Sequence, residues 1–162
     1  RRYEHAGKTA LEVGCGDGFS TEKLCTLFDN MDVIEPSTKN IELLRQKLPN
    51  INCFNVLLED FQTSKKYDFI FFLNILEHVE DPIASLKTLT SLIKDEGLIF
   101  ISVPNCMSLN RRAGYKMQLL ASYDQLAPKD IAVGHRRLYT VDMLTDHCQQ
   151  AGLKIIAMKE CI

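Results

Sequence analysis

The sequence has little net charge and no long hydrophobic run. Its 162 residues carry 19 basic and 21 acidic side chains, a formal net charge of −2, so no overall field attracts nucleic acid or a membrane surface. No apolar run approaches the ~20 residues that a membrane-spanning helix needs. The opening RRYEHAGKTA lacks the apolar stretch and cleavage site of a signal peptide. We therefore expect a cytoplasmic protein with no membrane span and no nucleic-acid partner.

A cysteine framework is also missing. The cysteines form no C-x-x-C pair, and none has a histidine at the spacing typical of zinc ligands. We predict reduced, mostly buried thiols and no metal site, with a disulfide or metal framework as the less favoured alternative. The six cysteines are Cys15, Cys25, Cys53, Cys106, Cys148 and Cys161.

Short apolar segments alternate with amphipathic ones along the chain, whose length fits one domain, 1–162. Strands are predicted at 9–13, 31–35, 52–59, 67–73, 97–104 and 153–160, and helices at 19–28, 36–48, 81–94 and 140–152. This alternation predicts an α/β fold with a doubly wound, mostly parallel sheet and helices on both faces. The stretch 105–139 is too long for an ordinary connection, and we predict an irregular or helical lid there. The chain starts almost on its first predicted strand and stops on its last, so we expect a fragment or a sequence trimmed at both ends.

The segment LEVGCGDGFS, residues 11–20, places a glycine at every second position between a predicted strand and a predicted helix. Ligands bind beyond the carboxyl ends of strands in open α/β sheets. A dinucleotide site favours G-x-G-x-x-G, but here Gly18 comes one position early and Phe19 occupies the place of the last glycine. The Glu12 carboxylate would repel a pyrophosphate and attract a cationic ligand. Glu35 can accept both ribose hydroxyls, a feature that nicotinamide sites share.

Four segments in order, LEVGCGDGFS, VIEP, VLLEDF and YDFIFFLNILEHVEDP, resemble the class I S-adenosylmethionine-dependent methyltransferases over nearly the whole chain. The resemblance implies a Rossmann-like fold, S-adenosylmethionine as methyl donor and S-adenosylhomocysteine as product. It implies that Glu12 helps to hold the amino group, that Glu35 binds the ribose, that 58–60 border the adenine and that 73–75 lie along the methionine. Leu57 stands where many relatives carry an aspartate. The cofactor-binding residues expected on this basis are Glu12, Gly14, Cys15, Gly16, Asp17, Gly18, Phe19, Glu35, Pro36, Ser37, Leu58, Glu59, Asp60, Leu73, Asn74 and Ile75.

Methyl transfer from a sulfonium is an in-line displacement, and a hydroxyl acceptor also needs a base. His78, in LEHV, and His135, in GHRRLYT, are the candidate catalytic residues, and they favour oxygen as the acceptor atom. The alternative for His78 is a histidine hydrogen-bonded into the turn before Asp81. The alternative for the segment that contains His135 is a polar start to the last predicted helix.

Basic residues are concentrated between 105 and 140, where the sequence has six lysines and arginines but only two aspartates. This excess favours a small anionic acceptor, whereas a solvated surface helix is the alternative reading. The substrate-binding candidates are Arg111, Arg112, Arg136, Arg137 and Tyr139.

The sequence thus predicts an S-adenosylmethionine-dependent methyltransferase that acts on a small, anionic acceptor, with O-methylation favoured. A nicotinamide-dependent oxidoreductase is disfavoured by Phe19. A non-catalytic cofactor-binding module is disfavoured because no loop glycine or acid is missing. A nucleic-acid methyltransferase would need interleaved aromatic and basic residues, or an N/D-P-P-Y/F run, and the chain has neither. The oligomeric state stays open.

Overall fold

The computed structural model describes residues 7–159, which belong to two compact units. The first unit contains the chain up to Leu73 together with residues 91–101, and the second contains 74–90 and the chain from Ser102 onward. The strands are β1 (Thr9–Val13), β2 (Asn30–Ile34), β3 (Asn52–Phe54), β4 (Tyr67–Leu73) and β5 (Ile93–Ser102). The helices are α1 (Phe19–Leu24), α2 (Thr38–Lys47), the 3-10 turn η1 (Leu58–Asp60), α3 (Pro82–Leu92), α4 (Leu109–Lys116), α5 (Pro128–Ala132) and α6 (Val141–Gln150).

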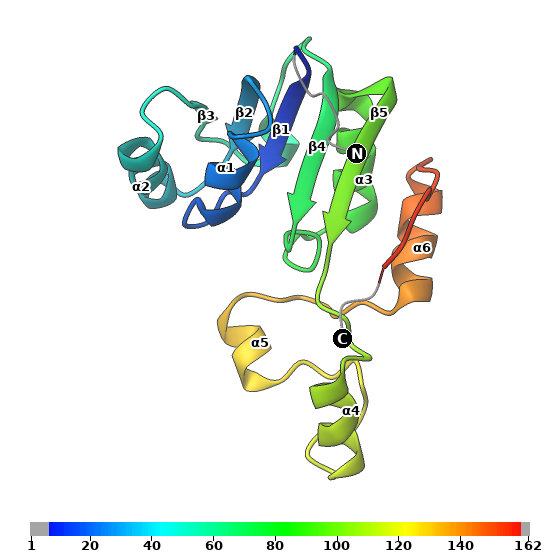
Figure 1. Cartoon of the computed structure of the whole chain (residues 1–162). Helices are drawn as coiled ribbons and strands as arrows, with labels where there is room; N and C mark the ends of the chain where they lie inside the picture. The colour runs from blue at the N-terminus through cyan, green and yellow to red at the C-terminus, as the bar shows by residue number, and fades with distance from the viewer. Residues whose placement is uncertain (1–6, 160–162) are drawn as a thin grey trace. The chain divides into compact units, whose positions relative to one another are not determined.

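The first unit is built on a five-stranded sheet of order β3-β2-β1-β4-β5. Strand β1 pairs in parallel with both β2 and β4, and β2 pairs in parallel with β3. The arrows of β4 and β5 also run the same way (Figure 1). Because the strand order reverses beside β1, the loops that follow β1 and β4 leave the same end of the sheet, where ligands bind in such folds.

A hydrophobic core forms where helices α1 and α2 cover the sheet. Leu24 of α1 and Leu44 of α2 pack against Ala10 and Val33 of the two central strands, and all four are buried. Phe28 extends this core and meets the rings of Phe69 and Phe71 on β4. Side chains from helices and strands thus fix the direction in which α1 leaves the glycine loop.

Local capping explains where three helices begin. The Ser37 hydroxyl accepts a hydrogen bond from the Asn40 N–H, and the Thr140 hydroxyl accepts one from the Met143 N–H. The Asp81 carboxylate accepts one from the Ala84 N–H. Each cap satisfies a backbone donor that the first turn leaves free, so these predicted helix starts are confirmed.

Several predicted boundaries are wrong. Residues 153–159 form no strand, although 153–160 was expected to, and Ile156 is 71% exposed there. The predicted helix 19–28 ends at Leu24, and the predicted strand 52–59 ends at Phe54 because η1 follows. Strand β5 begins at Ile93, within the stretch predicted as the end of the preceding helix.

The 105–139 stretch contains two short helices, α4 and α5, joined by irregular backbone, and a bridge between Asn105 and Tyr139 brings its ends together. Among residues 7–159, no helix is long and apolar enough to cross a membrane. No disulfide joins the five cysteines in this range, three of which are buried, and Cys161 lies outside the described residues.

Candidate active site

The loop between β1 and α1 adopts a backbone that requires glycine at alternate positions. Gly14, Gly16 and Gly18 have φ angles of 79°, 52° and 83°, a region that side chains disfavour. The Gly14 N–H donates to the Ile34 carbonyl at 2.8 Å, which ties the loop to the end of β2. Gly18 is also the N-cap of α1, so the helix begins directly where the loop ends.

The Glu35 carboxylate, at the end of β2, organises this loop. One of its oxygens accepts hydrogen bonds from the backbone N–H groups of Cys15 and Gly16 at 3.1 and 3.3 Å. The other oxygen accepts from the Ser37 N–H at 2.9 Å, and the residue is 5% exposed. A carboxylate offers about four acceptor positions, so three are occupied by the protein's own backbone. The sequence prediction placed Glu35 on a ribose and missed this internal role.

Glu12 is a second buried acid at the same place. It lies on β1, is 1% exposed, and its carboxylate accepts a hydrogen bond from the Thr21 hydroxyl at 2.6 Å. Burial raises the pKa of Glu12 to about 7; the Thr21 hydrogen bond opposes this rise and the Glu35 charge adds to it. A buried carboxyl that ionises near neutral pH is suited to receive a cation, which restores the interactions that burial removed.

Several other cofactor candidates of the first unit are exposed, among them Asp17 and Phe19. The Phe19 N–H donates to the Asp17 carboxylate at 3.1 Å, and the Phe19 ring is 61% exposed beneath the Lys23 ammonium. In η1, Leu58 is buried while the other two residues are exposed. These exposed residues are Glu59 and Asp60.

The second unit begins with a strained turn after β4. Asn74 has a φ of 54°, which asparagine tolerates better than most residues. Its N–H donates to the Ser102 carbonyl at 2.9 Å, and its side chain accepts from the Ser102 hydroxyl at 3.3 Å. The His78 N–H then donates to the Ile75 carbonyl at 2.8 Å, so a tight turn leads from Asn74 to the histidine.

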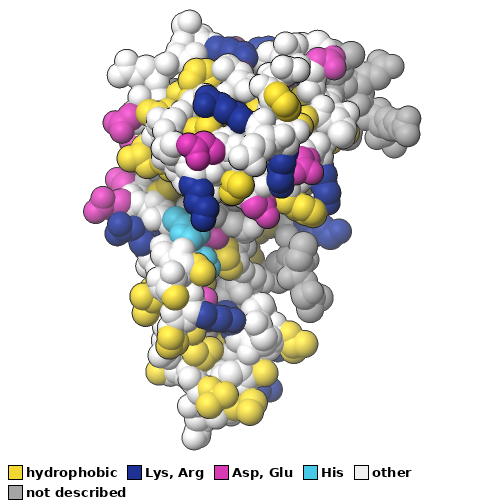
Figure 2. Space-filling model, turned by 90° about the vertical axis from the view of Figure 1, so that its left-hand side faces the viewer, with side chains coloured by type: hydrophobic (Ala, Val, Ile, Leu, Met, Phe, Trp, Pro, Cys, Tyr) yellow, Lys and Arg dark blue, Asp and Glu magenta, His cyan; other side chains and the backbone are white. Residues whose placement is uncertain are grey.

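Both predicted catalytic histidines belong to one cluster within this unit. The rings of His78 and His135 lie with centroids 4.8 Å apart at an angle of 74°. Burial and the neighbouring His78 lower the pKa of His135, while Asp130 opposes the shift. Histidine side chains gather as one group on the face shown in Figure 2.

Glu77 completes the cluster, and sequence reasoning missed it. It is fully buried, and neither carboxylate oxygen has a hydrogen-bond partner among the described residues. Burial raises the pKa of Glu77, an effect that the neighbouring His78 opposes. The sequence did contain a hint, because the acid directly precedes His78 in the LEHV segment.

Two of the predicted acceptor-binding arginines have internal roles. The Arg111 guanidinium donates to Asp130 at 3.1 Å and to the carbonyls of Tyr123 and Gln125. The Arg137 guanidinium donates to the carbonyls that end the His78 turn, which are those of Leu76, Val79 and Glu80. These guanidinium groups therefore have partners within the chain, and their contact with an acceptor stays a prediction.

Tyr139 also has an internal partner. It is 1% exposed, and its hydroxyl lies 3.3 Å from Nδ1 of His147. Burial raises the pKa of Tyr139 to about 12, so it stays a neutral phenol. By contrast, Arg112 and Arg136 have exposed side chains and stay candidates.

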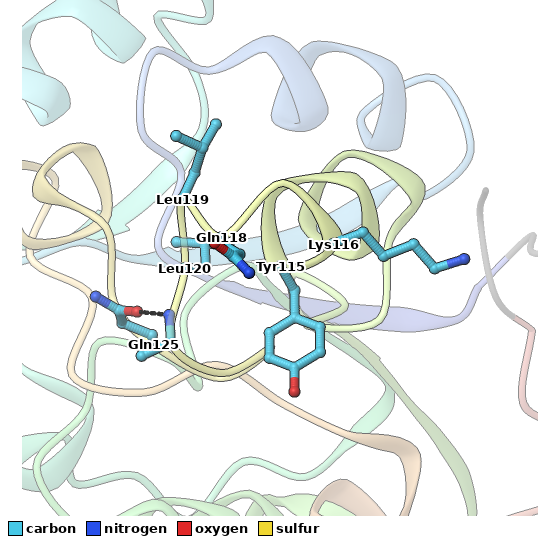
Figure 3. Close-up of a pocket in the computed structure, with 7 residues that line it drawn as sticks. Tyr115, Lys116, Gln118, Leu119, Leu120 and Gln125 are labelled. Carbon is cyan, nitrogen blue, oxygen red and sulfur yellow. Dashed lines mark hydrogen bonds between the residues drawn. The ribbon is translucent and has the colours of Figure 1, made fainter.

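An open pocket of about 550 Å³ lies in the second unit (Figure 3). It is formed by the end of α4 and the loop that follows, where the Ala121 N–H donates to the Gln125 side chain. None of its lining residues was predicted from the sequence. They are Tyr115, Lys116, Gln118, Leu119, Leu120, Ala121 and Gln125.

Comparison with known proteins identifies the family. A family model described as "Methyltransferase domain" matches residues 2–158. The ubiquinone biosynthesis O-methyltransferase of Actinobacillus pleuropneumoniae serotype 7 is 31% identical, and the match covers 94% of this chain and 68% of that protein. The enzyme of the same name from Haemophilus ducreyi is 26% identical with the same coverage. Some other matches are shorter: the match with a second Actinobacillus pleuropneumoniae enzyme covers 61% of this chain and 47% of that protein.

Solved structures agree on the fold. An S-adenosylmethionine-dependent methyltransferase from Clostridium acetobutylicum superposes with a TM-score of 0.72 at 14% identity, over 94% of this chain and 76% of that one. A plantazolicin methyltransferase solved with S-adenosylhomocysteine gives a TM-score of 0.69 at 22% identity, over 89% of this chain and 53% of that one. The predicted fold class is thereby confirmed. The chain belongs to the methyltransferase-domain family, whose Rossmann-like members use S-adenosylmethionine.

Proposed function

We propose that this protein transfers the methyl group of S-adenosylmethionine to an oxygen atom of a small-molecule acceptor. The observation that carries the proposal is the pair of buried acids, Glu12 and Glu35, on either side of the glycine loop in a chain of the methyltransferase-domain family. The donor carries a sulfonium and an ammonium group. Two buried carboxylates beside a glycine loop suit such a cation better than a pyrophosphate.

The residues present fit the methyl donor in chemical type. Glu12 is proposed to receive the amino group, because its carboxyl is buried and ionises near pH 7. Glu35 is proposed to accept a ribose hydroxyl at its remaining acceptor position, while its three backbone hydrogen bonds keep the loop in place. Residues 58–60 are proposed to border the adenine, and residues 73–75 to lie along the methionine part.

The paired imidazoles of His78 and His135 favour a hydroxyl acceptor. In this reaction the acceptor oxygen attacks the methyl carbon, the carbon–sulfur bond breaks, and S-adenosylhomocysteine leaves as the neutral thioether. The hydroxyl proton goes to an imidazole, and the lowered pKa of His135 keeps that ring neutral and able to accept it. Supporting evidence comes from the relatives, whose names state O-methylation in ubiquinone biosynthesis.

The acceptor is proposed to be a small anionic molecule. Arg112 and Arg136 offer exposed guanidinium groups in the second unit, and these bind carboxylates and phosphates well. An acceptor of the kind methylated in ubiquinone biosynthesis is the first class to screen, because curated relatives carry that name. The free cysteines support a reducing compartment such as the cytoplasm.

Calorimetric titration of the purified protein with S-adenosylhomocysteine tests the cofactor assignment, with NADH as the parallel control. Micromolar binding of the first and none of the second is expected. Binding of NADH alone would support the oxidoreductase alternative. A second assay then follows transfer of a labelled methyl group to hydroxylated carboxylates and phenols. Cofactor binding without transfer to any hydroxyl compound would contradict O-methylation and favour the non-catalytic module.

A further inference from the structure

We propose that Glu77, His78 and His135 form a binding site for a divalent transition-metal ion. One oxygen of the carboxylate and one nitrogen of each imidazole all lie within 4.8 Å of one another. The three side chains come from two segments that are far apart in the sequence. This explains why the spacing of residues along the chain gave no indication of a metal site.

The first argument is the state of the Glu77 side chain. A fully buried carboxylate without hydrogen bonds is costly, and proteins normally give such a group a partner. The nearby Arg137 is not a partner of the Glu77 carboxylate, because its guanidinium donates to three backbone carbonyls. The backbone N–H of Arg136 donates to the Glu77 backbone carbonyl at 2.9 Å, and this contact does not involve the carboxylate. A bound cation would supply the partner that these residues do not.

The second argument is the donor set. Two imidazoles and one carboxylate match the ligands of zinc, iron and related divalent ions, whereas calcium and magnesium prefer oxygen donors throughout. Metal–ligand bonds of ~2.1 Å allow two ligand atoms to be at most about 4.2 Å apart. The observed spread of 4.8 Å therefore requires only a small side-chain adjustment.

The third argument is that the surrounding backbone is organised to hold the two histidines close together. The His135 N–H donates to the Asp130 carbonyl at 2.9 Å, and the Asp130 carboxylate lies 3.9 Å from Nδ1 of His135. This separation is too long for a hydrogen bond, and the buried Nδ1 of His135 has no hydrogen-bond partner among the described residues. Gly134 has a φ of 86°, and a side chain there would lie 3.6 Å from Nδ1 of His78.

Three protein ligands leave a coordination position for an exogenous oxygen. If the proposed function holds, that oxygen belongs to the acceptor, and the ion rather than a free imidazole would lower its pKa. The ligand role and the base role are alternatives for the same two rings. The metal site itself does not depend on methyl transfer, so it is tested separately.

The test uses the purified chain, freed of metal with a chelator and titrated with Co²⁺. We expect one Co²⁺ per chain, visible d–d bands typical of nitrogen and oxygen ligands, and displacement by Zn²⁺. Glu77→Gln and His135→Gln should each weaken binding at least tenfold. His147→Gln is the matched control, because this histidine lies in the same unit outside the cluster, and it should bind like the parent protein.

Thermal unfolding provides a second readout that also shows whether each variant folds. Zn²⁺ should raise the Tm of the parent and of His147→Gln, and leave that of Glu77→Gln unchanged. Absence of stoichiometric binding, a sulfur-to-cobalt charge-transfer band, or binding that survives both cluster substitutions would overturn the proposal. S-adenosylhomocysteine titration of the same samples keeps this result separate from the proposed function.

Discussion

The Glu35 carboxylate accepts a hydrogen bond from the backbone N–H of Cys15 at 3.1 Å. This contact joins the end of β2 to the centre of the glycine loop. A residue expected only to meet the ribose therefore also maintains the loop on which the rest of the cofactor would lie. Loss of this carboxylate should affect affinity and stability together.

Replacing Glu35 by Ala should lower the affinity for S-adenosylhomocysteine at least tenfold, as measured by calorimetric titration. Hydrogen bonds to a charged group contribute about 1.5–3 kcal/mol each, and the substitution leaves the N–H groups of Cys15, Gly16 and Ser37 without this acceptor. Glu42→Ala, at an exposed position of α2, serves as the control and should bind normally. Unchanged affinity in Glu35→Ala would show that the cofactor site has been placed wrongly.

Two loop glycines should respond differently to alanine. At Gly18 an added Cβ would lie 2.8 Å from Leu44 Cδ1, in the buried core, whereas at Gly16 it would meet nothing within 4 Å. Both substitutions carry the ~1–2 kcal/mol cost of a left-handed backbone, and Gly18→Ala adds ~1–3 kcal/mol of overpacking. Urea unfolding should therefore show the larger loss of stability for Gly18→Ala. Equal losses of stability in the two variants would mean that α2 moves to accommodate the added methyl group.

Binding of S-adenosylhomocysteine should strengthen as the pH rises from 6 to 8. The pKa of Glu12 is about 7 in the ligand-free protein, and an ammonium group bound beside it would favour the ionised form. Binding below pH 7 should consequently release a proton, which calorimetry in buffers of different ionisation enthalpy detects. Glu12→Gln should remove this dependence, and Glu42→Gln should retain it. A pH-independent affinity would argue against contact between Glu12 and the amino group.

Glu12 should also influence the stability of the ligand-free protein. Its folded pKa of about 7 lies above the ordinary value of 4.5, so the protonated carboxyl contributes stability that is complete below pH 4.5 and is lost as the pH rises through 7. The loss is on the order of 3 kcal/mol at pH 8. Urea unfolding of Glu12→Gln should therefore show a gain relative to the parent at pH 8 that disappears at pH 4.5. An equal difference at both values would contradict a raised pKa.

The sequence predicted those features that depend on neighbouring residues. Strand β4 has the predicted bounds of 67–73, because a continuous apolar run needs only burial on both faces. The helix starts at Ser37 and Thr140 were predictable because a cap acts within three residues. The glycine loop was predictable for the same reason, because Glu12 and the alternating glycines all lie within one short segment of the sequence.

Features that depend on distant segments were missed. The stretch 153–159 has a strand-like composition, but a strand also needs a neighbour to pair with. Arg111 and Arg137 were assigned to an acceptor by their charge, whereas carbonyls elsewhere in the chain use their guanidinium groups. Glu77 was overlooked because its burial and its nearness to His135 arise only when the chain folds.

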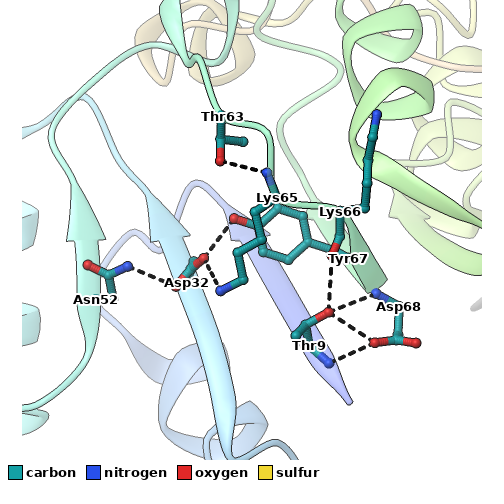
Figure 4. A network of polar contacts seen from close by, with 8 residues as sticks. All are labelled: Thr9, Asp32, Asn52, Thr63, Lys65, Lys66, Tyr67 and Asp68. Atoms are coloured by element: carbon teal, nitrogen blue, oxygen red, sulfur yellow. Dashed lines mark hydrogen bonds and ion pairs between the residues drawn. The ribbon is translucent and has the colours of Figure 1, made fainter. Parts of the chain in front are cut away.

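A buried polar network in the first unit should tolerate little change. The Tyr67 hydroxyl donates to the Asp32 carboxylate at 2.7 Å, and Lys65 and Asn52 donate to the same group (Figure 4). Tyr67→Phe removes one of these donors from a buried charge and should cost about 1–3 kcal/mol in urea unfolding at pH 7. Tyr115→Phe, at a 41% exposed position, should change stability by less than about 0.5 kcal/mol.

The same network sets a pH dependence for that substitution. Burial favours a higher pKa for Asp32, but the hydrogen bonds from Lys65, Tyr67 and Asn52 outweigh it and hold the pKa below its ordinary value of 3.8. The stability that the ionised Asp32 contributes is therefore present above pH 3.8 and lost as the pH falls further. The deficit of Tyr67→Phe should shrink when unfolding is measured at pH 3 instead of pH 7. A deficit that stays constant would mean that the hydroxyl stabilises the fold through packing and not through the Asp32 charge.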